Sequence, residues 1–408
     1  MVRKKAQLKG NMLIAQSGGP TVVINHSLVG AVLEAKQHPQ IKGIFGARHG
    51  VQGILEADFV DLRRENARFL EKVAQTPSSA LGSVRKKPTH EDCLRMFEVM
   101  QEYDIRYFFY VGGNDSAETA SIVNQEAQRA GFQLRCFHIP KTIDNDLREN
   151  DHTPGYGSAA RFVALAFMGD NLDNRALPGV KVNVVMGRRA GFLTAASALA
   201  RQYPDDGPHL IYLPERPFHI ERFADDVSRI FRKYGRCIVA VSEGVADKDG
   251  TPIAAAYTRE VDAHGNVQLS GTGALGDLLA RIVREKTAIK RVRADTFGYL
   301  QRSFPTVVSP VDAREARMAG RVAVRLAVRK DVDGSVAVKR ATGRGYRVAY
   351  KLVPLSAVAR ETRSMPDRFI AASGNDVTPA FVRYAAPLVG PLPRMARLHD
   401  HPIRRSRR

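Results

Sequence analysis

Short apolar runs that each end in a polar, glycine-containing string constrain the fold of this chain more than any other feature. The first three candidate strands are NMLIAQ, IRYFFYV and LRCFHIP, separated by helical patterns at about 22–37 and 116–130. A second series runs from VKVNVVM through HLIYLP to RCIVAVSEG, with helical patterns in AGFLTAASALARQ and IERFADDVSRIFRKY between them. Strands that alternate with helices form βαβ units and a mostly parallel sheet. The sequence therefore predicts two doubly wound, mostly parallel α/β lobes with the active site in the cleft between them.

The length of 408 residues is enough for about two domains of ~100–200 residues each. We place the first α/β lobe at residues 1–155, the second at 156–304, and a C-terminal segment that packs back on both lobes at 305–408. Within that segment SVAVKRATGRGYRVAYKLVPL is typical of a β-hairpin. The basic tail at 397–408 is expected to be solvated.

The formal net charge of +20 and the isoelectric point of about 10.1 suit an anionic ligand or a nucleic acid. Lys and Arg are spread along the sequence, and neither a zinc finger nor an aromatic RNA-binding signature accompanies them. We therefore expect small anionic substrates and no nucleic-acid partner.

The three cysteines and the hydropathy pattern indicate the compartment. Cys93, Cys136 and Cys237 show neither CxxC nor Cys/His ligand spacing, so they are expected to be buried, reduced thiols. No window approaches the ~18 consecutive apolar residues that a membrane span needs. We expect a soluble, cytoplasmic protein with no membrane partner.

Polar strings follow several of the candidate strands: SGGPT, GGNDS, PKTIDND, MGRRAG and PERPF, in that order. The carboxyl ends of parallel strands meet at one edge of a sheet, so these strings are expected to form a cleft wall. Gly18 and Gly19 can expose backbone N–H groups to an anion at a helix N-terminus, although a simple tight turn is an equal alternative. The string matches neither the P-loop nor the dinucleotide-binding pattern.

Two carboxylates and several arginines are candidates for chemistry at this edge. Asp144 and Asp146 lie two residues apart, so an extended backbone points both to one side, where one could accept a proton. An Asx-rich turn is the alternative. Arg85, Arg188 and Arg302 could each clamp phosphate oxygens with the guanidinium fork.

Taken together, these strings resemble the phosphofructokinase family. SGGPTVVIN, LGSVR, GGNDS, PKTIDND, MGRRAG, LPERPF and GYLQR stand in the order of that family between Met12 and about Gly320. The resemblance implies a Mg²⁺-dependent phosphotransferase. The first lobe would carry the pyrophosphate and Mg²⁺ site, and the second the sugar-phosphate site.

Two positions divide that family by phosphoryl donor. ATP-using members typically read GGDGS and PGTIDND, whereas pyrophosphate-using members carry the Asp and Lys that stand here as Asp115 and Lys141. Asp115 would repel the α-phosphate of ATP, because two unit charges ~4 Å apart interact by ~1–4 kcal/mol. With the steric clash added, ATP should be disfavoured as the phosphoryl donor by more than tenfold. Lys141 would neutralise the leaving group. The alternative for Asp115 is a helix N-cap that forms a capping box with Glu118.

The resemblance also implies individual roles. Asp144 would be the base that takes the proton from the 1-hydroxyl of fructose 6-phosphate, with Asp115, Lys141 and Arg85 as the other catalytic residues. Pyrophosphate would be bound by Gly19, Arg85 and Lys141, and the sugar phosphate by Thr142, Asp144, Asp146, Met186, Gly187, Arg188, Glu215, Arg293, Tyr299 and Arg302. Asn114 replaces a common metal-linked aspartate, so it is the predicted Mg²⁺ residue, and a neutral amide binds Mg²⁺ more weakly than a carboxylate.

The expected reaction is reversible transfer from pyrophosphate to fructose 6-phosphate, which yields fructose 1,6-bisphosphate and phosphate. Arg293 matches an arginine that reaches across from a neighbouring subunit in the family, which implies a homodimer or homotetramer. Two alternatives stay open, an ATP-dependent sugar-phosphate kinase and a basic nucleic-acid-binding protein on a degenerate kinase scaffold. Sedoheptulose 7-phosphate stays open as the acceptor.

Overall fold

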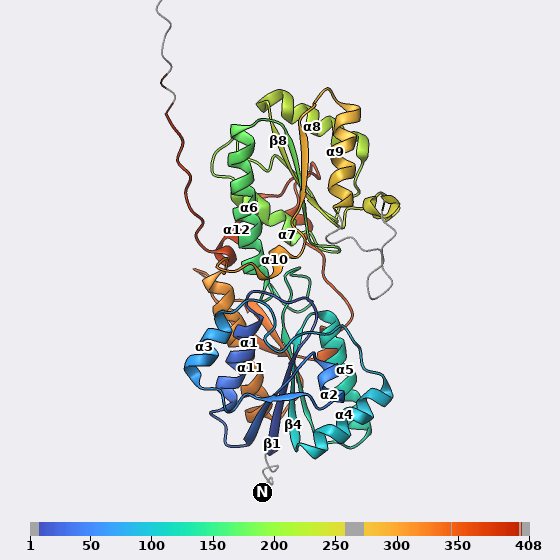
Figure 1. Ribbon diagram of the computed structural model, residues 1–408, viewed down its shortest axis with the longest axis vertical. Helices are drawn as coiled ribbons and strands as arrows, with labels where there is room; N and C mark the ends of the chain where they lie inside the picture. Colours follow the sequence, from blue (N-terminus) through green and yellow to red (C-terminus); the bar gives the residue numbers. More distant parts are fainter. Residues whose placement is uncertain (1–7, 258–272, 344, 400, 402–408) are drawn as a thin grey trace, which may run out of the picture.

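The computed structural model describes residues 8–257, 273–343, 345–399 and 401. The chain forms two α/β lobes, a large one around β1 and β4 and a small one around β8 (Figure 1). Each lobe is built on a mostly parallel sheet with helices on both faces. The predicted fold class is therefore confirmed, while the boundaries at residues 155 and 304 stay a prediction.

The sheet of the large lobe has seven strands, in the order β11-β10-β5-β4-β1-β2-β3. Their bounds are β1 (Gly10–Gln16), β2 (Ile41–Ala47), β3 (Phe59–Asp61), β4 (Ile105–Gly112), β5 (Arg135–Pro140), β10 (Gly334–Arg340) and β11 (Val348–Val353). The inner strands are parallel, and the edge strands β3 and β11 run antiparallel to their neighbours. An edge strand can reverse direction through a short hairpin, whereas parallel neighbours need a crossover.

Strand β4 shows why this sheet is covered on both faces. Tyr107 and Phe109 belong to the core with α1 and α11, whereas Phe108 and Tyr110 belong to the core with α2, α4 and α5. Successive side chains of a strand point to opposite faces, so a continuous apolar run requires helices on both sides. The helices of this lobe are α1 (Ile24–Ala35), α2 (Val51–Leu55), α3 (Ala67–Gln75), α4 (His90–Glu102), α5 (Asn114–Arg129) and α11 (Pro310–Lys330).

The small lobe carries a four-stranded, fully parallel sheet in the order β7-β8-β6-β9. The strands are β6 (Val180–Val185), β7 (Leu210–Tyr212), β8 (Cys237–Ser242) and β9 (Val292–Thr296). The helices are α6 (Tyr156–Ala176), α7 (Phe192–Ala195), α8 (Ile220–Tyr234), α9 (Ala274–Lys286), α10 (Leu300–Ser303) and α12 (Pro379–Val389). The helix predicted over AGFLTAASALARQ is wrong in type, because only α7 is α-helical and residues Ala196–Ala200 form a 3-10 helix.

The C-terminal part of the chain returns to both lobes. Helix α11 packs along α1, and the predicted hairpin is confirmed as β10 and β11, which extend the large sheet beside β5. Helix α12 packs on α6 of the small lobe. In the basic tail, Arg397 pairs with Asp205 and Asp206, and residues 402–408 lie outside the described part of the chain.

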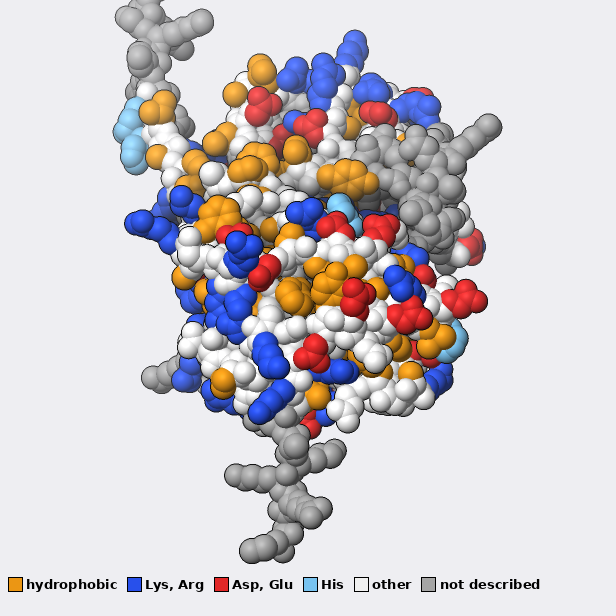
Figure 2. Space-filling view, turned by 60° about the horizontal axis from the view of Figure 1, so that its bottom comes forward, with side chains coloured by type: hydrophobic (Ala, Val, Ile, Leu, Met, Phe, Trp, Pro, Cys, Tyr) orange, Lys and Arg blue, Asp and Glu red, His pale blue; other side chains and the backbone are white. Residues whose placement is uncertain are grey.

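The surface charges, the cysteines and the helix hydropathy can each be compared with what the sequence predicted. Figure 2 shows Lys and Arg side chains mixed with Asp and Glu over the visible face. Cys93, Cys136 and Cys237 are buried free thiols, as predicted. Within the described ranges, no helix combines the length and apolar character that a membrane crossing would require.

Candidate active site

A cavity of about 1270 Å³ lies where the carboxyl ends of the strands of both sheets face each other. The large lobe contributes the segments after β1, β4 and β5, and the small lobe those after β6, β7, β8 and β9. Twelve residues predicted for the site line it: Gly19, Arg85, Asn114, Asp115, Lys141, Thr142, Asp144, Asp146, Met186, Arg188, Tyr299 and Arg302. The sequence strings at strand ends therefore do form one cleft wall.

The glycine turn after β1 forms the floor of the large-lobe side. Gly18 has a φ of +73°, which an L side chain rarely adopts, so the SGG turn depends on glycine. Its carbonyl oxygen accepts from the Ser83 hydroxyl at 2.6 Å, and the Ser17 hydroxyl contacts that of Ser116 at the start of α5. A Cβ on Gly19 would lie 3.1 Å from the Arg302 Cζ atom, so this turn touches a guanidinium of the small lobe. Small residues here allow the two lobes to approach.

Lys141 lies buried beneath that turn. Its Nζ donates to the carbonyl oxygens of Ser17 at 3.0 Å and Gly19 at 2.6 Å. Burial, together with the nearby positive charge of Arg302, lowers the pKa of the Lys141 ammonium to about 7. A bound anion would favour the charged form, so the ammonium can supply a positive charge at the moment an anion arrives.

Asp144 and Asp146 both line the cavity, but the backbone between them is a turn and not the predicted extended segment, because Asn145 has a φ of +59° and the Asp144 backbone N–H donates to Thr142 Oγ1 at 3.1 Å. Lys141, Ile143 and Asn145 are buried, whereas the two aspartates are partly exposed and line the cavity. Burial raises the pKa of Asp144. The surrounding cations lower it, and the Arg302 guanidinium has the largest lowering effect. Burial and the neighbouring Asp144 raise the pKa of Asp146 to about 7. One carboxyl of such a pair is suited to accepting a proton near neutral pH.

The loop that carries Asp144 is fixed by its own downstream segment. Thr153 donates its backbone N–H to Asn145 Oδ1 at 3.1 Å and its hydroxyl to the Thr142 carbonyl oxygen at 3.0 Å. Asn145 adopts a φ of +59°, a conformation that asparagine tolerates better than most residues. These bonds hold the chain on both sides of Asp144, at Thr142 and at Asn145.

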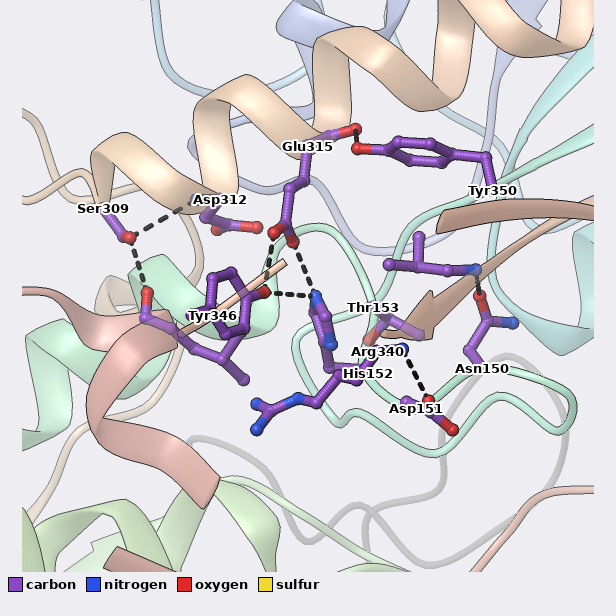
Figure 3. A network of polar contacts seen from close by, with 12 residues as sticks. Asn150, Asp151, His152, Thr153, Ser309, Asp312, Glu315, Arg340, Tyr346 and Tyr350 are labelled. Carbon is purple, nitrogen blue, oxygen red and sulfur yellow. Dashed lines mark hydrogen bonds and ion pairs between the residues drawn. The ribbon is translucent and has the colours of Figure 1, made fainter. Parts of the chain in front are cut away.

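Figure 3 shows how residues 150–153 are in turn held by α11 and the hairpin. His152 Nε2 lies 2.5 Å from Glu315 Oε2, and the Tyr346 hydroxyl donates to Glu315 Oε1 at 2.6 Å. The Val338 backbone N–H donates to Asn150 Oδ1 at 2.9 Å. The Asp144 loop is therefore anchored by segments more than a hundred residues later in the chain.

A second anchor comes from residues 358–365, which we name the strap. Arg363 in the strap donates its backbone N–H to the Asp146 carbonyl oxygen at 2.8 Å. Its guanidinium donates to the carbonyl oxygens of Asn145 and Asp151, each at 3.0 Å, and packs over the Phe192 ring. This arginine therefore ties the Asp144 loop to both lobes.

Asn114 and Asp115 begin helix α5. Gly113 is the N-cap and makes no side-chain cap bond, so the alternative of an Asp115–Glu118 capping box is wrong. Instead, Lys87 Nζ lies 2.9 Å from Asp115 Oδ1. The helix starts two residues earlier than a cap at Asp115 requires, because Gly113 already occupies the N-cap position.

The small lobe supplies Met186 and Arg188 after β6, and Tyr299 and Arg302 after β9. The Arg302 guanidinium lies 4.7 Å from the centre of the Tyr299 ring. Burial lowers the pKa of Arg302, yet an arginine stays protonated in proteins. Arg188 and Arg302 of the small lobe and Arg85 of the large lobe therefore place positive charge on both sides of the cleft.

Three predicted site residues do not line the cavity. Glu215 Oε1 accepts from the backbone N–H groups of Gly191 at 2.8 Å and Met365 at 2.9 Å, so this carboxylate ties the MGRRAG loop to the strap. Gly187, between the lining residues Met186 and Arg188, has a φ of +135° that favours glycine. Arg293 is exposed on the edge strand β9, away from this cleft. Their predicted substrate contacts stay predictions.

The cavity also includes residues that the sequence did not indicate, chiefly Lys87, Glu118, Glu243, Gly244 and Arg360. Glu243 and Gly244 follow β8 in the string VSEG, so the strand-end rule could have found them. A Cβ on Gly244 would lie 2.0 Å from the Arg188 carbonyl oxygen, which explains the glycine. Arg360 carries no such signal, because it reaches the cleft from the strap.

A cleft between two α/β lobes, with cations from both lobes around a partly exposed carboxylate, defines a protein that acts on phosphorylated anions. The Phosphofructokinase family model matches residues 11–327, and the chain belongs to the phosphofructokinase family.

Two relatives and one solved structure resemble the chain over nearly its whole length. Pyrophosphate–fructose 6-phosphate 1-phosphotransferase of Rhodospirillum rubrum is 58% identical over 97% of this chain and 98% of its own. The protein of the same name from Xanthomonas campestris pv. campestris is 38% identical over 93% and 91%. The structure of pyrophosphate-dependent phosphofructokinase from Nitrosospira multiformis matches with a TM-score of 0.84 at 33% identity, over 93% of this chain and 92% of its own.

Proposed function

We propose that this chain is a pyrophosphate-dependent 6-phosphofructokinase, a phosphotransferase that reversibly converts pyrophosphate and fructose 6-phosphate to phosphate and fructose 1,6-bisphosphate. The observation that carries the proposal is that Asp115 and Lys141, which mark pyrophosphate use in this family, line the same cavity. The names of the most similar relatives, which match over nearly the full length, support it.

At the donor end, the protein would bind pyrophosphate with the Gly19 turn, Arg85 and Lys141. A terminal phosphoryl group in flight spreads negative charge over its oxygens, and fixed cations stabilise that charge best where water is excluded. Lys141 is buried and held by two carbonyl oxygens, so its position is set before the substrate arrives.

At the acceptor end, Asp144 would take the proton from the 1-hydroxyl as the sugar oxygen attacks the terminal phosphorus in line. The P–O bond to the leaving phosphate then breaks, and its charge falls to Lys141 and Arg85. Thr142, Asp146 and Met186 would position the sugar, and Arg188, Tyr299 and Arg302 its 6-phosphate. The contacts that hold the Asp144 loop favour this proton transfer, because general-base catalysis needs a fixed geometry.

The donor set fits a divalent ion that arrives with pyrophosphate. No group of three or more His, Cys, Asp or Glu side chains gathers as a metal site in the described portion of the chain. Mg²⁺ usually takes one or two protein oxygens and fills its shell with phosphate oxygens and water. Asn114, at the start of α5, would hold Mg²⁺, which would neutralise part of the charge on the phosphate oxygens when bound. The amide nitrogen of Asn114 donates to the Arg360 carbonyl oxygen at 3.2 Å, which orients its oxygen.

Arg293 supports a proposal about assembly. It is exposed on an edge strand and outside this cleft, as expected of a residue that serves the 6-phosphate site of a neighbouring copy in a homodimer or homotetramer. We also propose a cytoplasmic location, which the three buried free thiols favour.

The function is tested by one coupled assay that compares pyrophosphate with ATP as donors, and fructose 6-phosphate with sedoheptulose 7-phosphate as acceptors. We expect turnover with pyrophosphate and fructose 6-phosphate in the presence of Mg²⁺, and far less with ATP. Turnover with ATP but none with pyrophosphate would overturn the proposal.

A further inference from the structure

An ion network of four side chains lines part of the cleft. Lys87 Nζ lies 2.9 Å from Asp115 Oδ1 and 2.7 Å from Glu118 Oε2. Arg360 Nε lies 2.8 Å from Glu118 Oε1. Two cations and two carboxylates alternate, so their formal charges cancel. All four side chains belong to residues that line the cavity.

The network joins three segments that are distant in sequence. Lys87 precedes α4, Asp115 and Glu118 lie in the first turns of α5, and Arg360 lies in the strap. The Glu118 side chain is 14% exposed, whereas that of Arg360 is 76% exposed, so the carboxylate lies beneath a solvent-facing guanidinium. Glu118 therefore has little access to solvent and depends on its two cations.

The strap is held firmly at this point. Val358 packs in a small core with Ala117 and Leu147, and Thr362 forms an antiparallel bridge with Leu147. The Arg360 carbonyl oxygen accepts from Asn114 Nδ2. These contacts flank Arg360 on both sides, so its position over Glu118 is set by packing as well as by charge.

The place of the network determines which donors can fit. Lys141, Asp144 and Asp115 line the same cavity, so we infer that a pyrophosphate whose reacting phosphorus lies between Lys141 and Asp144 would end near Asp115. A nucleoside triphosphate in the same position must continue outward with an α-phosphate and a nucleoside. Asp115 and Glu118 are three residues apart on α5 and face the same side, so a longer donor that passes the first carboxylate meets the second.

We propose that Lys87, Glu118 and Arg360 form a second determinant of donor choice, which excludes nucleotides even where Asp115 is absent. The inference deepens the proposed function and rests on it. A nucleotide would have to separate Glu118 from both cations and leave a poorly solvated carboxylate beside its own phosphates, which is unfavourable for two reasons at once.

The test compares Asp115→Gly, Glu118→Ala and the double variant. The readouts are kcat/KM for ATP, and the affinity for β,γ-imido-ATP measured by calorimetry, which needs no turnover. We expect Asp115→Gly alone to raise either value by about tenfold, and the double variant to exceed it by a further factor of about ten or more. Arg360→Gln, which changes an exposed residue, should give a smaller gain in the Asp115→Gly background.

Glu98→Ala is the matched control. Glu98 pairs with Arg95 at 2.8 Å on the exposed surface of α4, so this variant removes the same charge from the same lobe outside the cleft. The inference is overturned if the double variant binds the nucleotide no better than Asp115→Gly, or if Glu98→Ala in that background gives an equal gain. If the parent protein shows no pyrophosphate turnover, the proposed function is wrong, and this inference fails with it.

Discussion

Replacement of Lys141 by methionine should lower turnover steeply and stabilise the free protein. A pKa lowered from 10.5 to about 7 corresponds to roughly 5 kcal/mol of cost for keeping the ammonium charged in the folded state. Methionine removes that cost. It also removes the two hydrogen bonds to the Ser17 and Gly19 carbonyl oxygens, and their loss cancels about 1–3 kcal/mol of the gain in stability. The net expectation is a gain of ~2–4 kcal/mol in the free energy of unfolding near pH 7.

The sign of the pH dependence follows from the two pKa values. Below about 7 the lysine is protonated in both the folded and the unfolded chain, and the folded state bears the whole cost of burial. Between about 7 and 10.5 the folded lysine is neutral while the unfolded one is still charged, so the cost declines as pH rises. The parent should therefore gain stability with pH relative to Lys141→Met over this window.

Calorimetric unfolding at several pH values checks the stability, and pyrophosphate turnover checks the chemistry. We expect turnover to fall by ~10²–10³, because a positive charge that stabilises the transition state is lost. Lys72→Met is the control, since Lys72 is exposed on α3 of the same lobe. If Lys141→Met melts at or below the temperature of the parent at pH 7, the buried-charge argument is wrong; if turnover falls less than about tenfold, the catalytic role is wrong.

Three further variants probe the loop and the sugar side. Asp144→Asn should lower kcat by ~10²–10⁴ with little change in the KM for fructose 6-phosphate, and it should remove the acid limb of the pH profile, because the base works only when ionised and burial raises its pKa. Arg363→Gln should lower kcat more than it raises either KM, and Arg363→Lys should restore only part, because one ammonium cannot reach both carbonyl oxygens that the guanidinium holds. Gly244→Ala should raise the KM for the sugar phosphate, because its Cβ would displace the Arg188 backbone. Unchanged steady-state constants would contradict each expectation.

Patterns that are local in sequence predicted most of the fold and part of the site. Strands β1, β4 and β5 and helix α8 follow from apolar runs and helical periodicity. Asp144 and Asp146 do reach the cleft, but through a turn at Asn145, the alternative that the Asp-Asn-Asp string also allowed. The segment after α7 could not be predicted in detail. Its alanine-rich sequence suits an α-helix, but buried packing against α6 selects a 3-10 helix there.

Residues that reach the cleft through tertiary packing could not be predicted in this way. Arg360 contacts Glu118 across 242 residues of sequence, and no periodic pattern connects the two. Asp115 was expected either to cap α5 or to face a donor, yet its nearest charged partner, Lys87, lies 28 positions earlier and outside any strand-end string. Local rules place a residue at a cleft, whereas its partners depend on the packing of the strap and the loop before α4.

The cations of the cleft serve two purposes that are physically linked. Arg302, Lys141, Arg188 and Arg85 each lower the pKa of Asp144 and so oppose the effect of burial. The same groups are those proposed to bind phosphate oxygens. When phosphates neutralise these cations, the cations lower the pKa of Asp144 less, so that pKa rises and the carboxylate becomes a stronger base. Substrate binding would therefore raise the basicity of Asp144 at the moment the sugar hydroxyl arrives, without any movement of the loop that holds it. The proposed base lies at the meeting point of the two lobes, where cations from both of them act on one carboxylate, so this coupling can draw on both halves of the site.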